Sequence, residues 1–244
     1  MRIVVWFSCG TSSAVAAKLA IAKYGDDVSV VYCDTMKDEH PDNQRFFEDI
    51  QKWLGVPIQR IASTKYASVD EVFEARKYMS GIAGAPCTVE MKKVPRFAFQ
   101  RPGDIQIYGF RTDEASRIRD FEARNFDLNL EWPLRDKGYN QGRCEWLLAS
   151  EGIKLPVMYA LGYKNNNCLG CVKATSPAYW NAIRQDFPDV FAKRAEQSRR
   201  LGARLTRVKG ERIFLDELPY DADEGFMENI SCGPDCGPVE SVTP

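Results

Sequence analysis

Cysteine is the residue type with the widest chemistry in this sequence. Eight cysteines occur among 244 residues, and Cys168 and Cys171 form a CxxC pair in a segment rich in asparagine and glycine. Two thiolates at this spacing can bind one metal ion or cluster, whereas a thioredoxin-like dithiol sits at a helix start within a βαβ unit. We therefore expect Cys168 and Cys171 to bind a metal or cluster, together with ligands from distant parts of the chain.

A second group of residues could bind an anion. Residues 3–7 are apolar and β-branched or aromatic, and residues 14–22 are rich in alanine, leucine and lysine. These patterns predict a buried strand followed by a helix. The loop between them has small side chains, which leave the first amides of the helix open to an anion. Its candidate ligands are Ser8, Gly10, Thr11, Ser12 and Ser13. The alternative is an ordinary turn capped by Thr11 or Ser12.

Polar residues also follow two other predicted strands. Asp34 and Thr35 come after residues 28–33, and Arg111 comes after residues 105–110. Ligands of open parallel sheets bind at the carboxyl ends of the strands, and arginine can hold a phosphate or sulfate in bidentate fashion. The alternative for Arg111 is a charged helix surface with Glu114 in supporting ion pairs.

Alternating strands and helices must position these residues. The predicted strands are 2–8, 28–33, 56–61, 105–110 and 128–132, and the predicted helices are 12–24, 41–54, 69–79, 88–99, 111–124, 141–150, 178–186 and 189–201. A hairpin is predicted around Gly210. The alternation indicates a doubly wound α/β fold with a mainly parallel five-stranded sheet. We expect residues 1–133 to form a nucleotide-binding α/β domain. Residues 134–244 would be a helical and irregular cysteine-bearing appendage packed on that domain.

Composition narrows the function classes. The net charge is −1, and 44% of the residues are hydrophobic. No apolar run approaches the ~20 residues of a membrane span, and the first residues lead directly into a strand. We therefore expect a cytoplasmic protein with no membrane partner. A basic stretch could contact nucleic acid or a partner protein, but such runs are more often solvated. It comprises Arg194, Arg199, Arg200, Arg204, Arg207, Lys209 and Arg212.

The loop at residues 8–13 resembles the PP-loop of the adenine-nucleotide α-hydrolase superfamily, which usually reads Ser-Gly-Gly-Lys-Asp-Ser. Ser8, Gly10 and Ser13 match, and the lysine is missing. This variant is more similar to that of the PAPS and APS reductases, which bind an adenylyl sulfate without splitting ATP. The segment from Gly109 to Arg119 resembles the family element Gly-x-Arg-x-x-Glu-Ser-x-x-Arg, with one inserted residue. Asp34-Thr35 with the residues that follow resembles the element near ribose and adenine.

The segment from Cys87 to Pro95 resembles the element Cys-Cys-x-x-x-Lys-x-x-Pro of cluster-bearing sulfonucleotide reductases, whose partner element is a later CxxC. Cys87, Lys92 or Lys93, and Pro95 match, whereas Pro86 replaces the first cysteine. The resemblance implies a 4Fe–4S cluster, or alternatively zinc. Its ligands would be Cys87, Cys168, Cys171 and a tail cysteine, Cys232 or Cys236. We expect Cys9, Cys33 and Cys144 to be core thiols.

These resemblances imply a PAPS reductase-like enzyme of sulfur metabolism. A tail thiolate, which the resemblance assigns to Cys232, would attack the sulfur of a sulfonucleotide. AMP or its 3′-phosphate would leave, and a thiol reductant would release sulfite. Arg111 and Lys92 would act as catalytic cations that lower the pKa of the thiol. One alternative is an ATP-dependent sulfurtransferase that thiolates tRNA or DNA. Another is a non-enzymatic, redox-sensing nucleotide-binding module.

Overall fold

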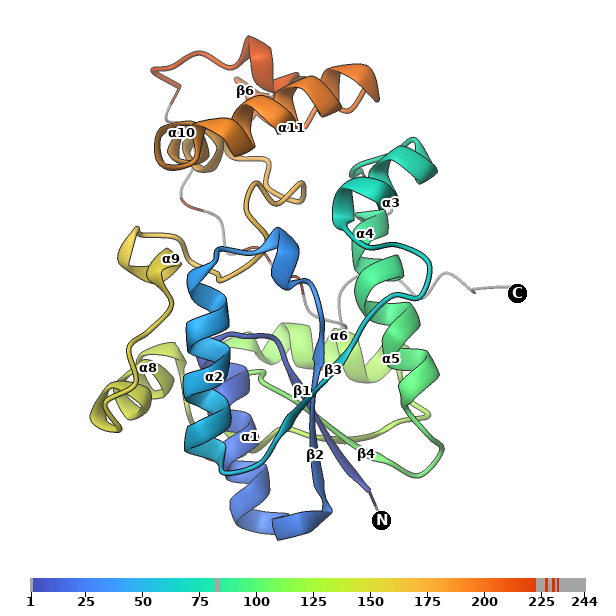
Figure 1. Cartoon of the computed structure of the whole chain (residues 1–244), viewed down its shortest axis with the longest axis vertical. Helices are drawn as coiled ribbons and strands as arrows, with labels where there is room; N and C mark the ends of the chain where they lie inside the picture. Colours follow the sequence, from blue (N-terminus) through green and yellow to red (C-terminus); the bar gives the residue numbers. More distant parts are fainter. Residues whose placement is uncertain (1, 82–83, 223–226, 228–229, 231, 233–244) are drawn as a thin grey trace.

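The computed structural model of the chain describes residues 2–81, 84–222, 227, 230 and 232. Its main sheet has five parallel strands in the order β3-β2-β1-β4-β5 (Figure 1). Their bounds are β1 Ile3–Phe7, β2 Val28–Cys33, β3 Ile58–Ile61, β4 Ile105–Tyr108 and β5 Asn129–Glu131. The predicted α/β fold with five parallel strands is therefore confirmed. The predicted hairpin forms a separate sheet of β6 Thr206–Val208 and β7 Glu211–Ile213.

Helices flank the sheet and continue beyond its carboxyl edge. The α-helices are α1 Thr11–Tyr24, α2 Asp42–Leu54, α3 Val69–Arg76, α4 Pro86–Thr88, α5 Val94–Phe99, α6 Ala115–Arg124, α7 Pro133–Asp136, α8 Gln141–Ser150, α9 Val157–Ala160, α10 Pro177–Asp186 and α11 Pro188–Arg200. Short 3₁₀ turns span Gly25–Asp27, Met36–Asp38, Thr112–Glu114 and Leu215–Glu217, and a π-helical turn spans Val89–Lys93.

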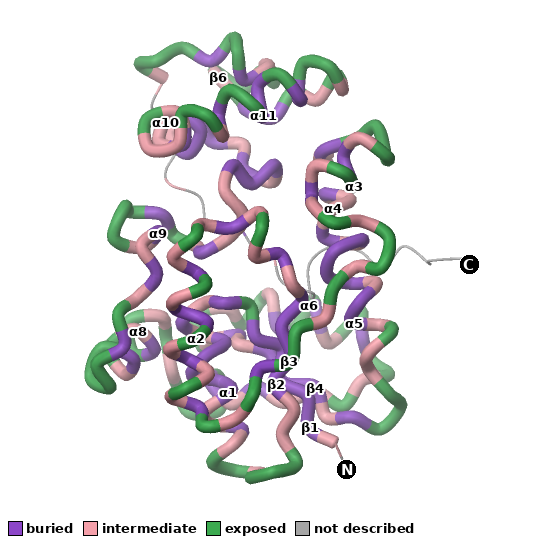
Figure 2. Tube along the Cα trace, in the orientation of Figure 1, coloured by how far each residue is buried: buried purple, intermediate pink, exposed green. Residues whose placement is uncertain are grey.

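The central strand β1 organises both faces of the sheet. All five of its residues are buried, as the apolar and β-branched sequence predicts for a strand covered on both sides. Val5 packs in the core that includes α1, α2 and α8, whereas Val4 and Trp6 pack in the core that includes α6. Alanines and Val15 on α1 are fully buried, and their small side chains let this helix lie close to the strands (Figure 2).

The strand order reverses at β1. The chain runs from β1 outward to β2 and β3, and then returns to place β4 on the opposite side of β1. In register, Ile3 lies beside Val28 on one side and Ile105 on the other. A crevice forms where such an order reverses, because the connections after the two neighbouring strands leave in opposite directions. We therefore expect a binding crevice at the carboxyl ends of β1 and β4.

A second hydrophobic core lies beyond the carboxyl edge of the sheet. It joins α3 and the turn that follows α4 to α10, α11 and the hairpin, with Trp180 and Ile183 fully buried (Figure 1). Leu134, Cys144 and Leu148, by contrast, belong to the core of the sheet. The cores therefore cross the division expected after residue 133.

Two predicted helices differ from the structure. The helix expected over 69–79 ends at Arg76, because Lys77 adopts a left-handed conformation with φ of 50° and turns Met79 into the second core. The helix expected over 88–99 is interrupted by the π turn at residues 89–93. Pro95 is the second residue after this turn and has no N–H for the helical ladder, which favours an irregular turn before it.

Across the described ranges, no helix combines the length and the apolar character needed to span a bilayer.

An ion pair joins the starts of β1 and β4 and yields a stability prediction. Arg2 donates to both carboxylate oxygens of Asp104, at 3.0 and 2.5 Å, and the Arg101 amide donates at 2.8 Å. Burial alone would raise the pKa of Asp104, but these donors outweigh it and lower the pKa. Asp104→Asn should therefore lower the free energy of unfolding by about 1–3 kcal/mol at neutral pH.

The pH dependence checks the cause. The pKa of Asp104 is lower in the folded state than in the unfolded state. The contribution of its ionised form to the free energy of unfolding is therefore complete above the unfolded-state pKa of about 3.9, and it disappears as the pH falls through the folded-state pKa. Urea unfolding of the wild type and Asp104→Asn at pH 7 and pH 3 should give a difference that shrinks at the lower pH. In an Arg2→Gln background the substitution should cost much less. A difference that grows on acidification would contradict this account.

Candidate functional site

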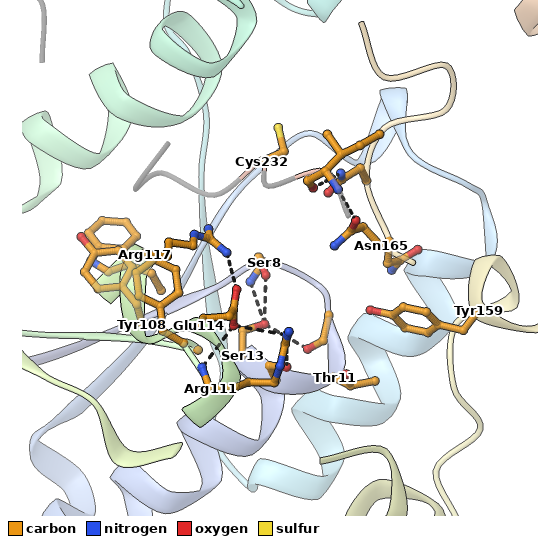
Figure 3. A pocket seen from close by; sticks show the side chains of 18 residues that line it. Ser8, Thr11, Ser13, Tyr108, Arg111, Glu114, Arg117, Tyr159, Asn165 and Cys232 are labelled. Carbon is orange, nitrogen blue, oxygen red and sulfur yellow. Dashed lines mark hydrogen bonds and ion pairs between the residues drawn. The ribbon is translucent and has the colours of Figure 1, made fainter. Parts of the chain in front are cut away.

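A cavity opens where the strand order reverses. The connections after β1 and β4 form its floor and one wall, and residues 159–167 with Ile230 and Cys232 form the opposite wall (Figure 3). Its lining includes every predicted loop ligand, namely Ser8, Gly10, Thr11, Ser12 and Ser13, and also Arg111 and Cys232. The structure thus brings the predicted anion loop, the predicted arginine and one tail cysteine to a single cavity.

The loop at residues 8–13 is shaped by backbone conformation and hydrogen bonds. Cys9 turns the chain from β1 towards α1 with a positive φ of 56°. The Ser13 hydroxyl accepts from the Ser8 amide at 3.0 Å and donates to the Gly10 carbonyl at 3.0 Å. Gly10 is the N-cap residue of α1 and supplies no side-chain cap, so the alternative of a cap by Thr11 or Ser12 is wrong. The Tyr159 hydroxyl hydrogen-bonds with the Thr11 backbone at the start of this 14-residue helix, and Gly10 supplies no capping side chain to the amides that follow.

Arg111 forms the wall opposite residues 159–167. Its guanidinium pairs with both carboxylate oxygens of Asp113, at 3.0 and 3.2 Å, and with Glu114 at 3.3 Å. It also lies 3.4 Å from the Ser12 hydroxyl at the start of α1. Glu114 in turn accepts from Arg117 at 2.6 Å. The two carboxylates thus hold the arginines beside the loop, where the arginines can attract an anion.

Asp34 and Thr35 lie elsewhere and do not line this cavity. Asp34 accepts from the Met36 amide and pairs with Arg60 at 3.3 Å. Thr35 is buried, and its hydroxyl donates to the carboxylate of Glu39 at 2.6 Å. Their polar groups are engaged in the turn after β2, so the structure brings neither residue to the anion loop.

The four described cysteines predicted as ligands or nucleophile lie together. Cys171 and Cys232 are joined by a hydrogen bond, and Cys87 and Cys168 lie close enough to interact electrostatically with Cys232. Cys236 lies outside the described residues. The expectation that Cys9, Cys33 and Cys144 are core thiols is confirmed, because each is at most 5% exposed. Burial raises the pKa of each of these three thiols.

Cys232 differs from its neighbours in its charge state. A hydrogen bond from Cys171 and the nearby Lys92 and Lys173 lower the pKa of Cys232, in spite of its burial. Burial instead raises the pKa of Cys87 to about 12. For Lys92, burial alone would lower the pKa, but the negative charge at Cys232 raises it. Cys232 is therefore the one thiol of this group that its surroundings favour as a thiolate.

The donor set can be compared with a metal centre. Four thiols that interact with one another match the ligand chemistry of an iron–sulfur cluster or a thiolate zinc site. In the part of the chain that the structure describes, however, no three His, Cys, Asp or Glu side chains form a group placed to hold a metal ion. The chemistry of the thiols fits, and a ligand geometry for a single ion is not formed by the described residues.

Several residues of the site were not predicted from the sequence. Tyr159 lines the cavity and forms a hydrogen bond with Thr11, and Asn165, Asn166 and Asn167 line the same wall. Asn166 donates to the Cys9 carbonyl at 2.8 Å. The run of asparagines before the CxxC pair was a visible signal, but the sequence did not show which distant backbone groups those amides would meet.

Three arginines of the basic stretch pair with acidic neighbours. Arg194 pairs with Asp70, Arg200 with Glu74, and Arg199 with Asp216 and Glu217. These contacts join α11 to α3 and to the turn after the hairpin. They favour a structural role for these arginines over a nucleic-acid surface.

Comparison with known proteins supports the fold. No protein-family model matches the chain, and no curated protein matches it. Among solved structures, phosphoadenylyl-sulfate (PAPS) reductase from Candida auris, in a phosphate complex, matches with a TM-score of 0.52 and 13% sequence identity. The match covers 69% of this chain and 81% of that chain. The chain therefore has a PAPS reductase-like fold.

The contact between the two connections at the site can be tested through Gly109. A Cβ atom at this position would lie 2.7 Å from both the amide nitrogen and the Cα of Ser13, and neither backbone atom can move alone. Gly109→Ala should displace the first turn of α1 and lower the free energy of unfolding by about 1–3 kcal/mol. Urea unfolding measures this loss.

Gly142 provides a matched control on α8. A Cβ there would meet only the Asn140 side chain, at an ordinary distance of 3.8 Å. Gly142→Ala should leave the unfolding midpoint unchanged or raise it slightly, because alanine is the better helix former. Equal midpoints for Gly109→Ala and the wild type would contradict the tight contact.

Proposed function

We propose that the chain is a sulfonucleotide reductase, in which the cavity binds the anionic end of an adenylyl sulfate and Cys232 is the nucleophile. The observation that carries this proposal is that Cys232, whose surroundings lower the pKa of its thiol, lines the same cavity as the loop at residues 8–13 and Arg111. The phosphate complex of the structurally similar reductase is consistent with an anion site in this fold.

Each group has a chemical task in this proposal. The open amides at the start of α1 and the guanidinium of Arg111 hold the phosphate and sulfate oxygens of the nucleotide. Lys92 donates to the Cys232 carbonyl at 2.7 Å and places a buried positive charge beside the thiolate. Trp6, Tyr108 and Phe110 border the cavity near the loop, and as buried core residues they form a rigid apolar base beneath it.

The reaction has two balanced steps. The Cys232 thiolate attacks the sulfur, the bond between sulfur and the bridging phosphate oxygen breaks, and the adenosine phosphate leaves. The enzyme then carries a Cys232 thiosulfonate. A thiolate of an external dithiol attacks the Cys232 sulfur, which releases sulfite and leaves a mixed disulfide that the second thiol of the reductant resolves. Two thiols of the reductant are thereby oxidised to a disulfide for each sulfite formed.

We further propose that Cys87, Cys168 and Cys171 bind a 4Fe–4S cluster, with Cys236 or an open iron position completing it. The proposal is supported by the interaction of each of these thiols with Cys232, by that of Cys168 with Cys171, and by the family resemblance of their segments. A bound cluster would tie the segments that carry these cysteines together through iron–sulfur bonds. Zinc on the same thiols is the alternative.

The nucleophile is tested with Cys232→Ser. Incubated with PAPS or APS and a dithiol reductant, the wild type should release sulfite, whereas the variant should release none because a serine hydroxyl is not ionised at neutral pH. Without reductant, mass spectrometry should find one SO₃ group on the wild-type Cys232 peptide only. AMP affinity by calorimetry should be the same for both proteins. Sulfite release by the variant would overturn the assignment.

Metal content tests the ligand set. Anaerobically purified wild type should be brown and contain iron and sulfide, because thiolate-to-iron charge transfer absorbs visible light. Cys168→Ser should lose iron, whereas Cys144→Ala, which removes a core thiol, should retain it. Cys232→Ser should also retain iron; a colourless Cys232→Ser protein would make Cys232 the fourth ligand. Colourless wild type containing zinc would overturn the cluster.

A further inference from the structure

Three consecutive asparagines connect the anion loop to the segment that carries Cys232. The side-chain oxygen of Asn165 accepts from the Ile230 amide at 2.6 Å, and the side-chain nitrogen of Asn167 donates to the Ile230 carbonyl at 2.7 Å. Both backbone groups of one tail residue are thus held by side chains, in the way that a neighbouring strand would hold them. Asn165 and Asn167 therefore hold the backbone of Ile230, two residues before Cys232, by hydrogen bonds.

The middle asparagine, Asn166, connects the asparagine segment to the anion loop. Asn166 is buried, and its nitrogen donates to the Cys9 carbonyl at 2.8 Å. Cys9 is the residue whose positive φ turns β1 into the loop, so this bond fixes the carbonyl at the turn itself. The side-chain oxygen of Asn166 is also buried and has no hydrogen-bond partner among the residues that the structure describes. All three asparagines line the cavity together with Ile230 and Cys232.

We propose that Asn165 and Asn167 are positioning residues that hold Cys232 over the anion loop, while Asn166 fixes the loop itself. This inference rests on the proposed function and adds residues to it. The Ile230 side chain packs in the second core, and Lys92 holds the Cys232 carbonyl, so the asparagines complete a three-point attachment of the tail. A nucleophile must be held close to its target atom, and a displacement of about 1 Å can cost ~100-fold in rate.

The different hydrogen-bonding roles of Asn165 and Asn167 permit a sharp test. Asn165 acts as an acceptor, and aspartate at this position keeps an oxygen for the Ile230 amide. Asn167 acts as a donor, and aspartate at that position has no N–H for the Ile230 carbonyl. Both substitutions add the same charge and change shape little. Asn165→Asp should therefore keep the Ile230 amide protected as in the wild type, and Asn167→Asp should lose the bond to the Ile230 carbonyl as Asn167→Ala does.

Two measurements are needed. Hydrogen exchange of a peptide containing Ile230 measures how well the Ile230 amide is protected by its hydrogen bond, independently of enzyme activity. Exchange should be faster in Asn165→Ala, because the amide loses its acceptor, and unchanged in Asn165→Asp. In sulfite release from PAPS or APS, kcat should fall by about 10- to 100-fold in Asn167→Ala with KM nearly unchanged, and kcat should fall to a similar extent in Asn167→Asp. Asn166→Ala should instead raise KM, because its bond shapes the loop.

Asn181→Ala is the matched control. Asn181 donates to the carbonyls of Pro219, Tyr220 and Ala222, so it also holds the chain before the tail, but it does not line the cavity. It should change neither Ile230 exchange nor kcat. Unchanged exchange of the Ile230 amide in Asn165→Ala would contradict the proposed hydrogen bond from this amide to Asn165. Faster exchange with an unchanged kcat in Asn167→Ala would overturn the positioning role. A wild type that releases no sulfite from either nucleotide would overturn the proposed reduction. The exchange data would still decide whether the asparagines hold the Ile230 backbone.

Discussion

The close approach of two backbone segments at the carboxyl edge of the sheet is the constraint on which the site depends. Gly109 at the end of β4 leaves no room for a Cβ atom against Ser13, so the connection after β4 touches the first turn of α1. This contact places Arg111 beside the open amides of the helix. The parallel order of β1 and β4 provides the two ends, and the absence of a side chain at one residue lets them meet.

Electrostatics at the opposite wall follow from one buried lysine. Lys92 lies in a π turn, is nearly fully buried, and has thiols and Glu39 as its charged or ionisable neighbours. A buried ammonium requires negative charge nearby, and a buried thiolate requires positive charge. Lys92 and Cys232 therefore stabilise each other's charged forms.

Local patterns predicted most of the fold. The apolar strand and alanine-rich helix around residues 3–22 were visible because their burial is set by side-chain type alone. A common site for Cys168 and Cys171 was expected from their CxxC spacing, and Cys87 was added to it from family resemblance. Asn165–Asn167 could not be assigned, because their partners are backbone groups at Cys9 and Ile230, and backbone groups carry no sequence signature. Asp34 and Thr35 had the right position along the chain, but a buried glutamate engages Thr35.

The π turn at residues 89–93 has a consequence for tolerated changes in chain length. A π turn is geometrically an α-helix with one residue inserted, so the residues before and after it are out of phase by about 100°. Deleting a single residue between Val89 and Lys93 would remove this phase shift and leave Pro95 inside a continuous helix, where it lacks the N–H for the helical ladder. The same deletion would rotate the Cys87 end of the helix relative to the Pro95 end. The Cys87 thiol and the Lys92 ammonium would then point in different directions. Chain length in this turn is therefore constrained by the direction in which its side chains point, and a neutral-looking deletion here would be more damaging than many substitutions.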